Sequence, residues 1–269
     1  MASFPFDQAE GLRRMVCGPR PRVLSVLSAA SAMDKQALLV NLSASLTHAG
    51  SKVLLLDATL SGNGLASRLA PACQPLLQVA RGHGRLEQAV TELPDALQVA
   101  SVARPGARAA LSVSELARVS GLFSELAACY DVTLVDAELD GEGDLLLPEL
   151  ASGEVLVQVS DSEASITGAY GLIKRLHARL GRRPMGLVVS GCSQAKAATV
   201  YRNMAQAASR YLAVELHSLG FVPDDEQLRR ANCLGRSVVD AFPLAGAAAA
   251  FRHLAGHYAR GNQLEAGHV

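Results

Sequence analysis

Three ionisable side chains, Lys35, Asp57 and Asp136, stand near places where the sequence changes from an apolar run to a loop, and the lysine among them could bind a phosphate. Lys35 follows the apolar residues 23–27 and a loop of small residues, while Asp57 and Asp136 each close another apolar run. A helix that begins after such a loop points backbone N–H groups at its N-terminal ligand, which favours an anion. Ligands of open parallel sheets bind at the carboxyl ends of the strands. The spacing therefore indicates a phosphate site beside Lys35.

A strand–helix–strand unit over residues 23–57 has to position these side chains. Residues 23–27 are predicted to form a buried strand, residues 28–34 a loop, and Lys35 opens a helix whose leucines recur at helical spacing. Gly50 ends that helix, and residues 52–57 form a second buried strand.

The rest of the chain repeats this alternation of apolar strands and amphipathic helices. Strands are predicted over residues 97–102, 130–136, 154–160, 185–190 and 214–222, and helices over residues 112–129, 164–180, 197–212, 226–234 and 245–260. Alternation of this kind is typical of an α/β fold with three layers, a mostly parallel sheet covered by helices on both faces. We expect one such domain over residues 22–260, a helical appendage with a proline-rich linker over residues 1–21, and a polar tail over residues 261–269.

The composition excludes several classes of protein. Hydrophobic residues make up 49% of the 269 residues and charged residues 19%, as in a compact globule. A formal net charge of zero gives no electrostatic reason to expect a nucleic-acid partner. The five cysteines lie far apart without a C-x-x-C pair, which favours reduced thiols in a cytoplasmic protein over a disulfide or zinc framework.

The strand–loop–helix unit resembles the P-loop of the MinD/ParA ATPases, whose motif has the form K-G-G-x-G-K-[ST]. Residues 30–36 keep one functional residue of that motif, Lys35; Gln36 replaces the hydroxyl that would hold magnesium, and no loop glycine remains. The resemblance implies that Asp136 holds magnesium through water, although an acid that caps the following turn is an equal alternative. Asp57 begins the family's D-x-D segment, whose second acid is Thr59 here. Several altered contacts favour a degenerate site.

Other segments resemble the flagellar branch of this family, called FlhG or FleN. Residues 162–174 are similar to its P-E-P-T-S-I-T-D-A-Y-x-L-I-K run, and residues 222–226 and 237–243 to its closing segments; Pro223 is assigned to the nucleotide site on this basis. Residues 7–13 match the N-terminal D-Q-A-x-x-L-R signature. The resemblance implies that this signature stimulates a signal-recognition-type GTPase, FlhF. The partner-binding residues would be Asp7, Gln8, Leu12 and Arg13.

These observations favour an FlhG-like regulator of flagellar number or placement that acts by binding FlhF and flagellar switch (C-ring) proteins. The alternatives are a MinD/ParA-type ATPase that is still active and a MinD-like positioning protein for another cargo. ATP and magnesium binding stay open, and no metal site is expected unless Asp136 binds magnesium. Ala30 replaces the signature lysine that reaches the partner subunit in relatives, so a monomer is favoured. The narrow stripe of Phe251, Leu254 and Tyr258 predicts docking onto the sheet rather than autonomous membrane binding, with recruitment to the cell pole left to partners.

Overall fold

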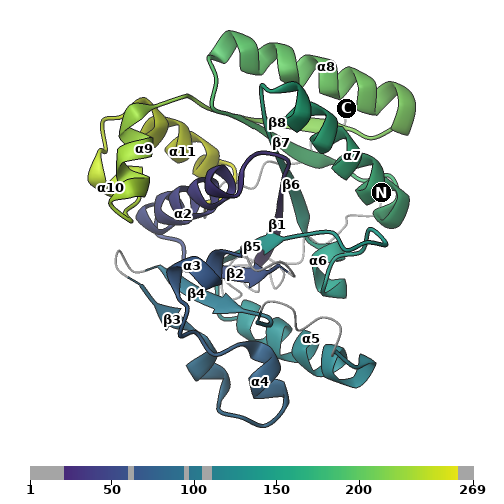
Figure 1. The fold of residues 1–269 in the computed structure, drawn as a ribbon, viewed down its shortest axis with the longest axis vertical. Coiled ribbons are helices and arrows are strands. Elements are labelled where there is room, and N and C mark those ends of the chain that lie inside the picture. The colour runs from purple at the N-terminus through teal and green to yellow at the C-terminus, as the bar shows by residue number, and fades with distance from the viewer. Residues whose placement is uncertain (1–20, 60–63, 94–96, 105–110, 260–269) are drawn as a thin grey trace, which may run out of the picture.

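The computed structural model describes residues 21–59, 64–93, 97–104 and 111–259 of the chain (Figure 1). Eight strands form one sheet in the order β3-β4-β2-β5-β1-β6-β7-β8. The strands are β1 (Arg22–Ser28), β2 (Val53–Ala58), β3 (Thr91–Glu92), β4 (Gln98–Ser101), β5 (Val132–Ala137), β6 (Glu154–Ser160), β7 (Met185–Ser190) and β8 (Leu216–Val222). All neighbours run parallel except β3 and β4, which are antiparallel.

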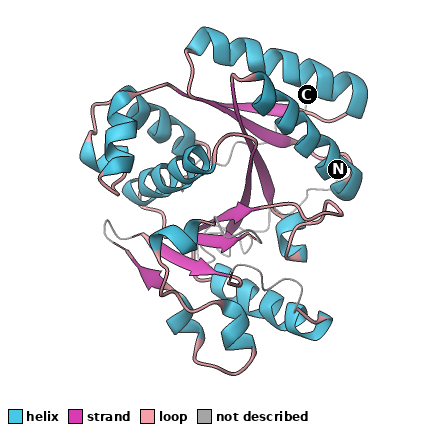
Figure 2. Cartoon of the chain, viewed as in Figure 1, coloured by secondary structure: helices cyan, strands magenta, loops and turns pink. Residues whose placement is uncertain are grey.

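Helices cover both faces of this sheet, as the side-by-side layers of Figure 2 show. One face carries α2 (Ala32–His48), α3 (Leu65–Leu69), α9 (Glu226–Cys233), α10 (Val238–Ala241) and α11 (Gly246–Gly256). The other carries α4 (Leu76–Ala80), the 3-10 helix η1 (Leu86–Ala89), α5 (Val113–Ala127), α6 (Pro148–Ser152), α7 (Glu163–Leu180) and α8 (Gln194–Leu212). The predicted three-layer α/β fold is therefore confirmed.

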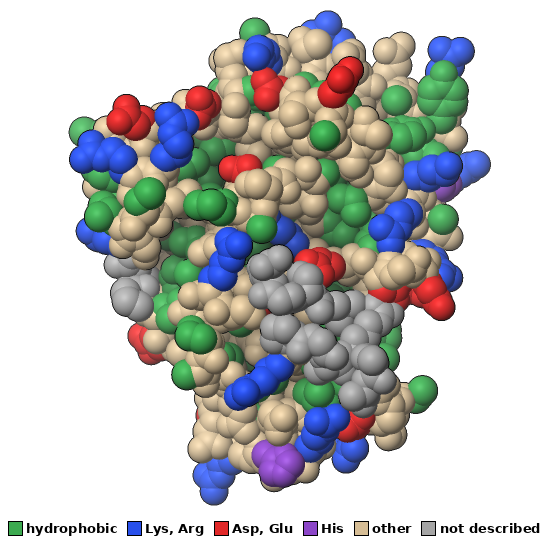
Figure 3. All heavy atoms as spheres, in the orientation of Figure 1, with side chains coloured by type: hydrophobic (Ala, Val, Ile, Leu, Met, Phe, Trp, Pro, Cys, Tyr) green, Lys and Arg blue, Asp and Glu red, His purple; other side chains and the backbone are tan. Residues whose placement is uncertain are grey.

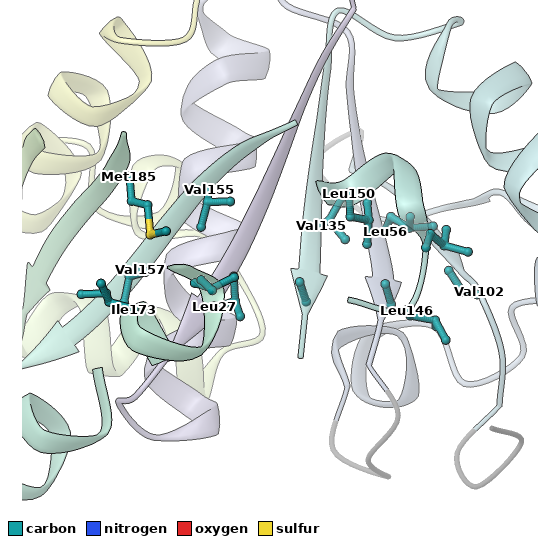
Figure 4. Packing of buried hydrophobic residues seen from close by; sticks show 14 of the residues in the cluster. Leu27, Leu56, Val102, Val135, Leu146, Leu150, Val155, Val157, Ile173 and Met185 are labelled. Carbon is teal, nitrogen blue, oxygen red and sulfur yellow. The ribbon is translucent and has the colours of Figure 1, made fainter. Parts of the chain in front are cut away.

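Each face of the sheet has its own apolar core, because neighbouring residues of a strand point to opposite faces. On β2, Leu54 and Leu56 enter one core while Val53 and Leu55 enter the other. Figure 4 shows part of the first core, with Leu56 beside Val135 of β5. Burial on both faces explains why the strands read as continuous apolar runs rather than as alternating ones.

Serine caps set the beginnings of the long helices. Ser112, Ser162 and Ser193 each accept a hydrogen bond from the N–H three residues further on, at the starts of α5, α7 and α8. Such a cap contributes about 1 kcal/mol. At the other end of α7, Gly181 has a φ of 70°, a conformation that favours glycine.

The predicted boundaries are close for the long elements and wrong by three or four residues at three helix ends. The helix predicted over residues 197–212 begins at Gln194, because Ser193 caps it. The helix predicted to open at Lys35 begins at Ala32, because Ser31 caps it. The last helix was predicted to reach residue 260 but ends at Gly256. The stripe of Phe251, Leu254 and Tyr258 is buried against the sheet and α2, as predicted. The predicted N-terminal helix, with Asp7, Gln8, Leu12 and Arg13, and the tail over residues 261–269 lie outside the described residues.

The face of the molecule drawn in Figure 3 carries mixed charge rather than charges of one sign. On the face drawn in Figure 3, Lys and Arg side chains are interspersed with Asp and Glu side chains. Among the residues that the structure describes, no helix combines the length and the apolar character needed to cross a membrane.

Candidate functional site

The loop between β1 and α2 is tied to the sheet by one buried amide, Gln158 of β6. The Ser28 hydroxyl donates to Gln158 Oε1 at 2.8 Å and accepts from the Ala30 N–H at 3.0 Å. Gln158 Nε2 donates to the Asp34 carbonyl and to Ser190 Oγ, both at 3.1 Å. The loop is thus fixed from β6 and β7. Gln158 was not among the predicted site residues, although a glutamine inside an apolar strand is a signal in itself.

The N-terminus of α2 is occupied by its own side chains. Ser31 Oγ accepts from the Asp34 N–H at 3.1 Å and donates to Asp34 Oδ2 at 2.6 Å. Residues 32–34 therefore form a helical turn, in the part of the loop that would wrap around a phosphate in a P-loop. A negative charge in the first turn is favourable to the helix dipole. An incoming phosphate would meet the Asp34 carboxylate at the end of the helix where it should bind.

Lys35 is engaged inside the protein. Its ammonium forms an ion pair with Asp136 and donates to the Ala137 carbonyl at 2.8 Å. The two side chains are only 12% and 6% exposed, so this pair is nearly removed from water. Removing either partner of such a pair leaves a buried charge without compensation, which is strongly unfavourable. The one functional residue kept from the P-loop motif is thus held by the carboxyl end of β5 in this structure.

Asp57 and Asp136 lie side by side, since they are register partners on β2 and β5. The start of α3 covers both: the Leu65 N–H donates to Asp136 Oδ2 at 2.9 Å and the Ala66 N–H to Asp57 Oδ2 at 2.8 Å. Thr59 donates to Asp57 Oδ1 from its N–H at 3.0 Å and from its hydroxyl at 2.7 Å. Burial raises the pKa of the Asp57 carboxyl, and Asp136 adds to the rise, while the bonds from Thr59 and Ala66 oppose it.

Gly64 permits this close approach of α3 to the carboxylates. A Cβ atom at Gly64 would lie 2.2 Å from both Asp57 Oδ2 and Thr59 Oγ1. We expect Gly64→Ala to lower the free energy of unfolding by about 1–3 kcal/mol, the usual cost of overpacking. Gly171→Ala is the matched control, because that helical glycine faces open space and alanine should stabilise α7 by about 0.5–1 kcal/mol. Urea unfolding measures both, and equal stability of the two variants would contradict the contact.

Gln36 also has a partner within the chain. Its side-chain oxygen accepts from Arg68 Nη1 of α3 at 3.1 Å, which links α2 to α3. The position that should offer a hydroxyl to magnesium therefore offers an amide already used by a cation. Nothing in the sequence pattern pointed to Arg68.

The predicted site residues come together only in part. Lys35, Gln36 and Asp136 line a cavity of about 300 Å³. Asp57 does not line it, but it accepts a hydrogen bond from Thr59, which does. Pro223 follows β8 and lines a separate groove instead. As arranged, the cavity does not fit a magnesium-bound nucleoside triphosphate. The N-terminus of α2 already carries the Asp34 carboxylate. Lys35 is paired with Asp136 Oδ1, and Asp136 Oδ2 accepts from the Leu65 N–H.

The chain is similar to proteins of known name over most of its length. It is 30% identical to the antiactivator FleN of Pseudomonas aeruginosa over 243 residues, which cover 87% of this chain and 85% of that protein. The structure matches the cell division ATPase MinD of Pyrococcus furiosus with a TM-score of 0.63 and 21% identity, over 87% of this chain and 97% of that one. It matches a ParA family ATPase of Chlorobium tepidum with a TM-score of 0.64 and 20% identity, over 88% and 99% of the two chains.

The two structural matches, at about 20% identity, establish the fold. The match to FleN, at 30% identity, establishes the family. No protein-family model matches the chain. The identity to FleN extends over nearly the whole described domain, and the sheet order and helical layers are those of a MinD/ParA fold. The chain therefore belongs to the FleN family, the FlhG/FleN-like branch of the MinD/ParA-type proteins.

Proposed function

We propose that this protein regulates the number or placement of flagella by binding other proteins, on a MinD/ParA fold that does not turn over ATP. Its relation to an antiactivator supports a regulatory role, since a protein of that name restrains an activator and needs a binding surface for it. The proposed absence of ATP turnover is supported by Lys35, whose ammonium pairs with Asp136 and donates to the Ala137 carbonyl.

The internal bonds of the site support the proposal that this fold acts without nucleotide. Leu65 and Ala66 donate to the two aspartates, and Arg68 donates to Gln36, so α3 is held against β2, β5 and α2 by the chain itself. In an ATPase, bound nucleotide and magnesium would supply part of this order. Here the arrangement is built in, which suits a scaffold that presents fixed surfaces to partners.

The N-terminal segment is the proposed partner-binding end. Its D-Q-A-x-x-L-R signature supports an FlhF-type GTPase as the partner, with Asp7, Gln8, Leu12 and Arg13 as contact residues. A short capped helix with an internal glycine gains little stability alone, and an apolar face on it is best covered by a partner groove. Recruitment to the cell pole or flagellar base would then follow from the partner.

A turnover assay with the partner GTPase tests this proposal. A peptide of residues 1–21 should raise GTP turnover, and Gln8→Ala or Leu12→Asp should abolish the increase, whereas Ser3→Ala, outside the signature, should leave it intact. The full chain without residues 1–20 should give no stimulation. Equal stimulation by that truncated chain would refute the assignment.

A further inference from the structure

A second hollow, larger than the cavity at Lys35, lies along the β8 edge of the sheet. It measures about 800 Å³ and runs between α8 and α11, both of which contact β8. In Figure 1 the two helices stand on either side of this end of the sheet. Its lining is mostly apolar: Ala197, Ala198 and Tyr201 from α8, Phe221 and Pro223 from and after β8, and Ala250 from α11. This volume lies within the usual range of ligand-binding pockets.

The charged and ionisable side chains of the groove favour a ligand with a negative charge. Arg202 and His253 line it, and none of its lining residues, all within the described part of the chain, is acidic. The strand edge itself is partly closed, because the Tyr201 hydroxyl donates to the Leu216 carbonyl at 2.9 Å. A segment that binds here is therefore held mainly by apolar side chains and an acid, rather than by a full ladder of backbone hydrogen bonds.

We propose that residues 4–7 of this same chain, Phe-Pro-Phe-Asp, occupy the groove. Two of the chain's six phenylalanines, Phe4 and Phe6, stand in this short segment, and Asp7 follows them at once. The apolar lining matches the two rings, and the Arg202 guanidinium matches the Asp7 carboxylate. The described structure begins at Pro21, so this segment belongs to the part of the chain that precedes it.

The connecting chain is long enough to reach. Three strand spacings, about 14 Å, separate β1 from β8 across the sheet, and the groove extends to Pro223, about 20 Å along the strands from the amino end of β1. The direct distance is therefore at most about 25 Å. The fourteen residue steps from Asp7 to Pro21 can span up to about 46 Å when extended. A short tether also raises the effective concentration of the segment to the order of millimolar, so modest contacts suffice. A partner protein that binds Asp7 and Gln8 must then displace residues 4–7 from the groove. This consequence rests on the proposed function.

Tryptophan fluorescence in the full chain tests the docking. The protein contains no tryptophan, so Phe4→Trp introduces a single reporter. We expect its emission to be shifted to the blue, and its quenching by acrylamide to be severalfold weaker, relative to a free peptide of residues 1–8 with the same change. Ala198→Glu places a carboxylate in the groove against Asp7, and Ala250→Glu does the same from the opposite wall. Each should return the emission to that of the free peptide.

Matched controls come from the same helices. Ala195 of α8 and Ala249 of α11 are exposed and do not line the groove, so Ala195→Glu and Ala249→Glu should keep the blue-shifted emission. Urea unfolding checks that each variant is folded. Emission typical of water in the Phe4→Trp protein itself would overturn the proposal, and so would a blue shift that survives both groove substitutions. No GTPase takes part, so the result is independent of the partner assay.

Discussion

Purified protein mixed with ATP and magnesium should release phosphate no faster than a protein-free control. Lys35 is held by Asp136, Gln36 offers an amide bound to Arg68, and Thr59 stands where relatives have a second acid. Loss of one group that stabilises a transition state costs about 100- to 1000-fold in rate. Three such changes at one site should bring turnover below detection.

Two measurements sharpen this expectation. Lys35→Ala should leave phosphate release unchanged, because the proposed site without turnover gives the lysine no part in catalysis. The thermal midpoint of the parent protein should also stay the same at millimolar ATP, since a ligand that binds the folded state raises stability by RT ln(1 + [L]/Kd). Turnover that exceeds the control and disappears in Lys35→Ala would instead identify a working ATPase.

The fold was predictable because its long elements carry strong periodic signals. Residues 154–160 were predicted as a strand and form β6 without a shift, since residues 155–159 are apolar apart from Gln158. The structure also contains the short elements α6, α10 and β3, which were not predicted. Two to five residues are too few to show a period, and such elements depend on neighbours for their form.

The site was predictable only where chemistry follows from position in the chain. Lys35 and Asp136 were found because they follow apolar strands. Their covering by α3 was not, because its donors are the backbone N–H groups of Leu65 and Ala66, which no residue type marks. Gln158 reaches the Asp34 carbonyl across 124 positions, and a single sequence does not record such a contact.

The start of α2 was also mispredicted, because one residue, Ser31, fits two local structures. Ser31 lies in a run of small residues that fits a loop, and the predicted loop continued to Asp34. The hydrogen bonds between Ser31 and Asp34 make the last residues of that loop the first turn of α2. Serine favours loops and N-caps for the same reason, its short hydroxyl, so the pattern alone does not separate them.

Lys35→Met should lower the free energy of unfolding by about 3–5 kcal/mol, the cost of leaving one partner of a buried ion pair alone. The substitution removes the ammonium while keeping an unbranched side chain that suits the helix. Asp136 would then lie beside Asp57 of the neighbouring strand. Among the contacts that the structure describes, it would keep only the hydrogen bond from the Leu65 N–H. Urea unfolding at neutral pH measures the loss.

An exposed pair of the same charges provides the control. Lys196 and Asp161 lie 3.2 Å apart, with side chains 69% and 32% exposed, so Lys196→Met should cost less than about 1 kcal/mol. Adding Asp136→Asn to Lys35→Met should restore most of the stability, because asparagine can still accept from Leu65 without a buried charge. If Lys35→Met costs no more than Lys196→Met, the lysine is not committed to Asp136. It would then be available for phosphate, and the proposal of a site without turnover would lose its support.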